Sequence, residues 1–114
     1  VEDHEINRFL ATTVLENWKM NVDVAENGKI AVEKVKNNQY DIVLMDMQMP
    51  EMGGIEATQI IRNELHNNVP IIALTANAIK GDADKCKQAG MNDYVSKPFD
   101  PSDLYNKILT LINQ

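Results

Sequence analysis

The chain of 114 residues contains a single cysteine, no long apolar run and fewer basic than acidic residues. Because Cys86 has no second cysteine to pair with, an internal disulfide is excluded, as is usual in a reducing compartment. No apolar run reaches the roughly 18 residues of a membrane-spanning helix. The 17 acidic and 11 basic side chains argue against nucleic-acid binding, because a phosphate backbone requires a basic surface. We therefore expect a cytoplasmic domain that contacts neither nucleic acid nor membrane, whether or not a longer parent chain is membrane-anchored.

The sequence also lacks linkers, repeats and low-complexity tracts. Its length is enough for one hydrophobic core but not for two, so we expect residues 1–114 to form one domain. Segments patterned as helices alternate with segments patterned as strands. Apolar residues at helical spacing predict helices at 5–17, 28–37, 54–66, 79–89 and 101–112.

Four segments are patterned as strands. Residues 42–45 and 70–74 are apolar throughout, which is typical of parallel strands covered on both faces. Residues 21–25 alternate between apolar and polar, which predicts an edge strand half open to water, and 93–96 form a short predicted strand. The alternation predicts an α/β fold in which right-handed crossovers build a parallel sheet with helices on both faces.

Ligands of such sheets bind beyond the carboxyl ends of the strands, so the residues at those ends are the functional candidates. Asp46, Thr75 and Lys97 each follow one of the last three predicted strands. Glu2 and Asp3 precede the first helix, where a first strand would end. The sheet should therefore bring several carboxylates and one lysine to a single edge.

Carboxylates placed so close together repel one another, and a cation is the usual remedy. Ligands that are all oxygen select a hard divalent ion such as Mg²⁺. A metal beside a carboxylate and a lysine suits phosphoryl transfer, in which the carboxylate can be the nucleophile that forms an acyl phosphate. Asp46 is the strongest candidate, because Pro50 and the pair Gly53-Gly54 follow it in a loop stiff enough to hold it outward.

Four motifs in order resemble a known family. They are the acidic pair Glu2-Asp3, DMQMPEMGG from Asp46 to Gly54, TAN from Thr75 to Asn77, and YVSKPF from Tyr94 to Phe99. Together they resemble the receiver domain of two-component response regulators across essentially the whole chain. The stretch from Thr75 to Leu104 is most similar to receivers of hybrid sensor histidine kinases. The one departure is Glu-Asp in place of two aspartates.

The resemblance implies a flavodoxin-like (βα)5 fold, a doubly wound five-stranded parallel sheet with strand order 2-1-3-4-5. In that order the first strand lies between the second and the third, yet it is truncated at Val1. We therefore expect the native chain to carry about four to five mostly apolar residues before Val1, which is a typical strand length.

The resemblance also implies a reaction. Asp46 would accept a phosphoryl group from the phosphohistidine of a histidine kinase, and the receiver would catalyse its own phosphorylation and dephosphorylation. The group would then switch a surface of the domain or pass to a histidine phosphotransfer domain. Mg²⁺, or Mn²⁺, would be bound by Asp3, Asp46 and the backbone carbonyl of Gln48, with Glu2 acting through metal-bound water.

Other residues would assist the acceptor. Thr75 would donate a hydrogen bond to the phosphoryl group, and Lys97 would pair with it. The Lys97–Pro98 peptide would be cis, which would aim the lysine into the site. Tyr94 would be an aromatic switch that responds to Thr75.

Gln48 and Asn77 would flank the path of the hydrolytic water. Both are uncharged amides that can hold a water molecule but cannot act as a general base near neutral pH. Gln48 is also long enough to obstruct the path. The expectation is slow or intermediate loss of the phosphoryl group.

Simpler interpretations remain open. An aspartate that ends a strand is often only a turn or cap residue, and Tyr94 could simply pack. Met45, Met47, Met49 and Met52 fit as adaptable fillers of gaps in the core. The domain could also be a pseudo-receiver that acts through surface contacts without phosphorylation, or a flavodoxin-like nucleotide or flavin binder. The absence of a Gly-rich phosphate loop after any predicted strand argues against the nucleotide or flavin binder.

Overall fold

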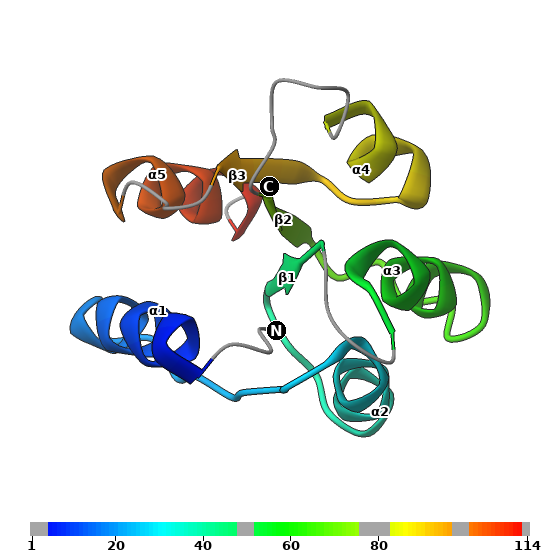
Figure 1. Ribbon diagram of the computed structural model, residues 1–114, viewed down its shortest axis with the longest axis horizontal. Helices are drawn as coiled ribbons and strands as arrows, with labels where there is room; N and C mark the ends of the chain where they lie inside the picture. Colours follow the sequence, from blue (N-terminus) through cyan, green and yellow to red (C-terminus); the bar gives the residue numbers. More distant parts are fainter. Residues whose placement is uncertain (1–4, 48–51, 76–82, 97–100, 113–114) are drawn as a thin grey trace.

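The computed structural model describes residues 5–47, 52–75, 83–96 and 101–112. Within these ranges five helices and three strands follow one another along the chain (Figure 1). They are α1 (Glu5–Asn17), α2 (Gly28–Asn37), β1 (Val43–Asp46), α3 (Gly54–Asn63), β2 (Ile71–Thr75), α4 (Ala83–Ala89), β3 (Asp93–Ser96) and α5 (Pro101–Ile112).

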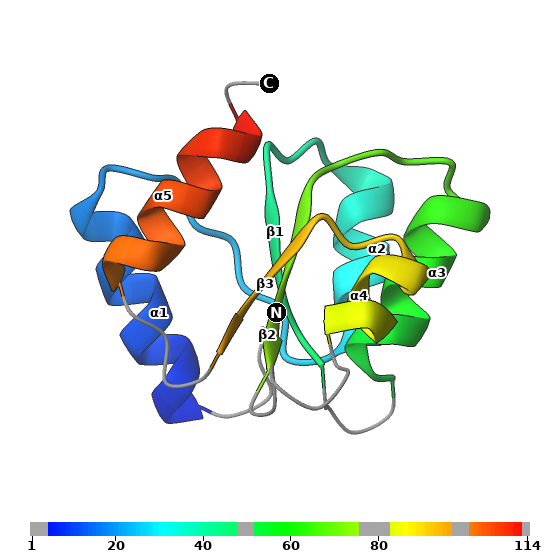
Figure 2. The same ribbon diagram turned by 90° about the horizontal axis from the view of Figure 1, so that it is seen from above.

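The three strands form one parallel sheet in the order β1-β2-β3. Val43 of β1 pairs with Ile71 of β2, and Ile72 of β2 pairs with Asp93 of β3, so the carboxyl ends of all three strands lie at one edge. Helices α1 and α5 cover one face of the sheet, and α2, α3 and α4 cover the other (Figure 2). The predicted α/β fold is confirmed, and these strands are the third, fourth and fifth of the five expected.

The central strand β2 is buried along its whole length. Ile71 and Ala73 pack into the core beneath α2, α3 and α4. Ile72 and Leu74 point to the opposite face, where they pack with Ile108 of α5. A strand covered on both faces needs an apolar side chain at every position, which explains the continuous apolar run of its sequence.

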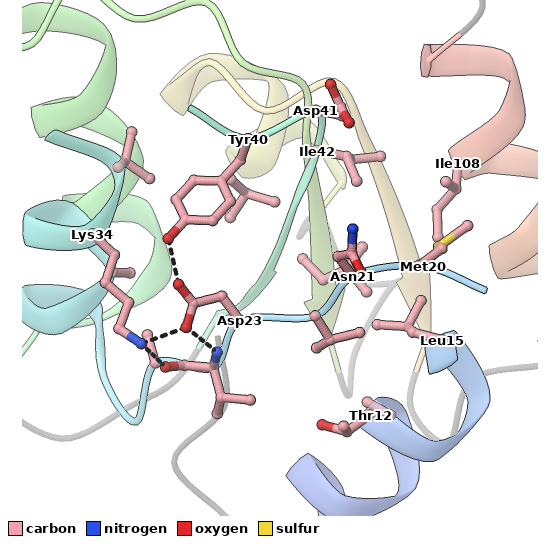
Figure 3. A pocket seen from close by; sticks show the side chains of 18 of the residues that line it. Thr12, Leu15, Met20, Asn21, Asp23, Lys34, Tyr40, Asp41, Ile42 and Ile108 are labelled. Carbon is pink, nitrogen blue, oxygen red and sulfur yellow. Dashed lines mark hydrogen bonds and ion pairs between the residues drawn. The ribbon is translucent and has the colours of Figure 1, made fainter. Parts of the chain in front are cut away.

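The strand predicted at 21–25 is not formed, so that prediction was wrong. Within the described part of the chain, no backbone–backbone hydrogen bond reaches these residues. An alternating pattern suits a strand, but a strand also needs a neighbouring backbone to pair with. A groove of about 670 Å³ lies between this segment and β1 instead, where the 2-1-3 order would put the first strand (Figure 3).

Side-chain contacts of Asp23, rather than hydrogen bonds to a neighbouring strand, hold this segment. Its carboxylate accepts hydrogen bonds from Nζ of Lys34 at 2.7 Å and from the hydroxyl of Tyr40 at 2.6 Å (Figure 3). The hydrogen bond from Lys34 is the largest of the causes that lower the pKa of Asp23 to about 2. Burial, followed by the hydrogen bond to Asp23, raises the pKa of Tyr40 to about 12.

Two helices differ from their predicted lengths. Helix α3 ends at Asn63 rather than near residue 66, and His66 has a φ of 50°, in the left-handed region that a helix cannot contain. Helix α4 is described only from Ala83, so the first part of the helix predicted at 79–89 lies outside the described residues.

Candidate functional site

Asp46 is the last residue of β1, and only 5% of it is exposed. The buried residues Val43 and Met45 anchor the strand before it. The pairing to β2 runs one residue beyond it, because the N–H of Met47 donates to the backbone oxygen of Leu74 at 3.1 Å. The backbone on both sides of the carboxylate is therefore fixed, as the apolar run before Asp46 predicted.

Thr75 ends β2 beside Asp46. In the ladder Asp46 pairs with Leu74, the residue directly before Thr75, and Thr75 pairs with Ser96 at the end of β3. Only 2% of Thr75 is exposed. The structure thus places a carboxylate and a hydroxyl at neighbouring strand ends, which offers a nucleophile and a hydrogen-bond donor at one edge.

The first residue of α3 packs directly against the backbone of Asp46. The N–H of Gly54 donates to the backbone oxygen of Met47 at 3.2 Å. A Cβ atom at position 54 would overlap the backbone oxygen of Asp46 and lie 3.0 Å from Cγ of Met45. Only glycine lets the helix begin this close to the strand end.

The methionines around Asp46 fill the core beneath α2, α3 and α4. Met45 is fully buried, and Met47 and Met52 pack against the same core from its edge. Sδ of Met47 lies 3.5 Å from Sγ of the buried Cys86 on α4. The interpretation of these methionines as fillers is confirmed for all except Met49, which lies outside the described residues.

Six of the predicted site residues also lie outside the described ranges. They are Glu2, Asp3, Gln48, Asn77, Lys97 and Pro98. Of the expected metal ligands, Asp46 is the one that the structure describes. Accordingly, no group of three or more His, Cys, Asp or Glu side chains among the described residues could hold a metal ion.

Tyr94 lies in the middle of β3 and is half-buried. Its ring packs against the core beneath α2, α3 and α4. Nζ of Lys107 on α5 lies 5.0 Å from the centre of this ring. Lys107 could not be singled out from the sequence, because no local pattern connects a lysine in the last helix with a tyrosine in the preceding strand.

Residues 1–109 match the family model of the response regulator receiver domain. The chain belongs to the response regulator receiver family. The match confirms the resemblance drawn from the four motifs. The receiver is 43% identical to "Hybrid signal transduction histidine kinase B" of Dictyostelium discoideum over an alignment of 116 residues. That alignment covers 91% of this chain and 6% of the Dictyostelium protein.

Solved structures of receivers share the fold. The receiver domain of sensor histidine kinase PA1611 from Pseudomonas aeruginosa PAO1, with a magnesium ion coordinated in its active site cleft, has a TM-score of 0.91 at 38% identity. The match covers 100% of this chain and 94% of that one. The receiver domain of Saccharomyces cerevisiae Ssk1, solved with the histidine phosphotransfer protein Ypd1, has a TM-score of 0.89 at 33% identity. That match covers 94% of this chain and 81% of the other.

These relatives confirm the resemblance to receivers of hybrid histidine kinases. The receiver spans only 6% to 13% of the length of the curated relatives it matches. None of the helices in the described ranges is long and apolar enough to cross a membrane.

Proposed function

We propose that this receiver accepts a phosphoryl group on Asp46. The observation that carries the proposal is a buried carboxylate at the end of β1, beside Thr75, in a member of the receiver family. A carboxylate oxygen of Asp46 attacks the phosphorus atom of a phosphohistidine, the phosphorus–nitrogen bond breaks, and the imidazole leaves with the bonding electrons. The product is an acyl phosphate on Asp46.

Thr75 and Lys97 stabilise the charge on the phosphoryl oxygens. The hydroxyl of Thr75 donates a hydrogen bond, and the ammonium group of Lys97 forms an ion pair. The ladder supports this assignment, because Thr75 pairs with Ser96, which directly precedes Lys97 in the sequence. Phosphoryl transfer depends mostly on positioning and charge neutralisation, so residues at adjacent strand ends are well suited to it.

Mg²⁺, or Mn²⁺, fits the oxygen donors of this site. Asp3, Asp46 and the backbone carbonyl of Gln48 would bind the ion, and Glu2 would act through metal-bound water. Asp46 contributes a poorly exposed carboxylate to this set, and carboxylate and carbonyl oxygens are the donors that a hard divalent ion prefers. When bound, the ion would neutralise charge on the phosphoryl oxygens. The magnesium ion of the Pseudomonas receiver supports the same assignment.

The partners of the domain are proteins that carry a phosphohistidine. We propose that the donor is the phosphohistidine domain of a histidine kinase and that a histidine phosphotransfer domain can receive the group. The support comes from the hybrid kinase among the relatives and from the complex of the Ssk1 receiver with Ypd1. From the hybrid kinase among the relatives we propose that the chain is the cytoplasmic receiver portion of such a kinase. The excess of 17 acidic over 11 basic side chains supports a domain that contacts neither nucleic acid nor membrane directly.

Phosphorylation reshapes the surface formed by α4, β3 and α5, which we call the signalling face. In this proposal Thr75 moves toward the phosphoryl group, and Tyr94 rotates into the space that it leaves. The register supports a short path between them: Tyr94 pairs with Ala73, two residues before Thr75 on the same strand.

Phosphoryl uptake followed by intact-mass spectrometry tests the proposal. With Mg²⁺ and a small phosphodonor such as acetyl phosphate, the wild type should gain the mass of one phosphoryl group. The matched control is Asp46→Asn, whose side chain has the same shape but is a poor nucleophile, so it should gain none while circular dichroism shows an intact fold. Uptake by Asp46→Asn at the wild-type rate would move the acceptor elsewhere. No uptake by the wild type would favour the phosphorylation-independent pseudo-receiver.

A further inference from the structure

Lys107 of α5 reaches Tyr94 of β3 in two ways. Its Nζ donates a hydrogen bond to the backbone oxygen of Tyr94 at 2.6 Å. The same nitrogen lies 5.0 Å from the centre of the Tyr94 ring, a distance at which a cation is attracted to the face of an aromatic ring. One lysine therefore contacts both the backbone and the ring of Tyr94.

Two carboxylates keep the ammonium group in this place. Asp103, one turn earlier on α5, lies 3.5 Å from Nζ of Lys107, and Asp93 lies 3.7 Å from it. Asp93 is itself tied to the strand, because its Oδ1 accepts the backbone N–H of Tyr94 at 2.8 Å. The side chain of Lys107 is only 25% exposed, so its neighbours restrict it more than those of a surface lysine would.

The contact joins the two faces of the sheet. The ring of Tyr94 packs against the core beneath α2, α3 and α4, whereas α5 covers the opposite face (Figure 2). β3 is the last strand in the order β1-β2-β3, so the lysine connects the faces around the outer edge of this sheet. Rotation of the ring must break the contact with Nζ of Lys107.

We propose that Lys107 is a positioning residue that holds Tyr94 in its resting orientation and so sets how readily the signalling face changes. This inference rests on the proposed function, in which Tyr94 rotates after Asp46 is phosphorylated. Removing the charge at position 107 should raise the ratio of rotated to resting ring by about two- to fivefold, the equivalent of one partly exposed cation–π contact.

NMR of isotope-labelled tyrosine tests the inference in the unphosphorylated protein. The Tyr94 signal is assigned with Tyr94→Phe, and three-bond couplings give the ratio of its side-chain rotamers. Lys107→Met, which keeps the aliphatic stem, should raise the rotated fraction, and Lys107→Arg should restore the wild-type ratio. Lys36→Met, which removes the same charge from an exposed position on α2, is the matched control and should change nothing.

Phosphoryl uptake by intact mass is measured on the same variants. Lys107→Met should take up the group as the wild type does, because Lys107 does not touch the acceptor in this account. If the wild type takes up no phosphoryl group, the proposed function is wrong. The rotamer ratio of Tyr94 in the unphosphorylated variants would still decide the role of Lys107. If Lys107→Met folds poorly, Asp103→Asn on the exposed side of α5 should shift the ratio in the same direction. An unchanged ratio in the folded variants, or an equal shift in Lys36→Met, would overturn the inference.

Discussion

Replacing Gly54 by alanine would place a methyl group between α3 and the end of β1. The new Cβ would overlap the backbone oxygen of Asp46 and lie 3.0 Å from Cγ of Met45. The strand cannot retreat as a flexible side chain can, because Asp46 and the residue after it are paired with β2. Either α3 or Asp46 must therefore shift.

Two opposing effects set the size of the change. Inserting a methyl group into a packed core costs about 1–3 kcal/mol. Alanine is a better helix former than glycine by about 1 kcal/mol in a helix interior, but Gly54 is the first residue of α3, so this preference offsets only a fraction of the cost. We therefore expect Gly54→Ala to lose roughly 1–2 kcal/mol of unfolding free energy, or about 4–8 °C in Tm for a domain of this size. If Asp46 is the acceptor, its displacement should also slow phosphoryl uptake by roughly tenfold or more.

Thermal unfolding by circular dichroism and uptake by intact mass measure the two effects. The matched control is Gly53→Ser, one residue earlier, where the nearest atom to a new Cβ is the backbone oxygen of Met47 at 3.3 Å. Gly53 has an ordinary φ of −78° and caps α3 without a side-chain hydrogen bond, so serine should leave Tm unchanged or raise it slightly. A wild-type Tm and uptake rate in Gly54→Ala, or equal losses in both variants, would show that the close approach of Gly54 to Asp46 is not required.

Three further predictions concern lifetime, acid stability and the groove. The double variant Gln48→Ala, Asn77→Ala should change the rate of phosphoryl loss measurably. Its Mg²⁺ affinity should stay nearly unchanged, because Gln48 would bind the ion through its backbone. An unchanged rate of phosphoryl loss would show that other residues control water access. The pKa of Asp23 is lowered to about 2 in the folded protein, below its unfolded value of about 3.9, so its stabilising effect is complete above the unfolded value and is lost as pH falls toward 2. Unfolding measured from pH 6 to 2 should show the wild type losing its advantage over Asp23→Asn, and a constant difference would contradict this. Adding five apolar strand-forming residues ahead of Val1 should raise Tm by filling the groove beside β1. Five polar residues added at the same place should not raise Tm. Equal effects of the two additions on Tm would argue against strand pairing in the groove.

The sheet edge that carries Asp46 and Thr75 could be predicted from the sequence. A strand covered on both faces must be apolar at every position, so the continuous runs before these residues located both strands and their ends. Parallel pairing then brings the ends together, as the register of Asp46 with Leu74 shows. Local pattern was sufficient here because burial acts on every residue of such a strand.

Features that depend on a distant partner could not be predicted in this way. The alternation at 21–25 does not show whether a neighbouring backbone is there to pair with, and Val24, which a paired strand would turn inward, is 38% exposed. The contact of Lys107 with Tyr94 joins two elements through a side chain that local periodicity does not constrain. The sequence also shows two adjacent glycines without showing that Gly54, rather than Gly53, is the one pressed against a backbone oxygen of Asp46.

Chemical mapping of the modified residue decides whether Asp46 carries the phosphoryl group. The protein is treated with acetyl phosphate and Mg²⁺, reduced with borohydride, which converts an aspartyl phosphate to homoserine, and then digested for peptide mass spectrometry. We expect homoserine at position 46 in the wild type and at no position in Asp46→Asn. Homoserine at another aspartate, or its absence from a protein that has gained the mass of a phosphoryl group, would show that Asp46 does not carry the group.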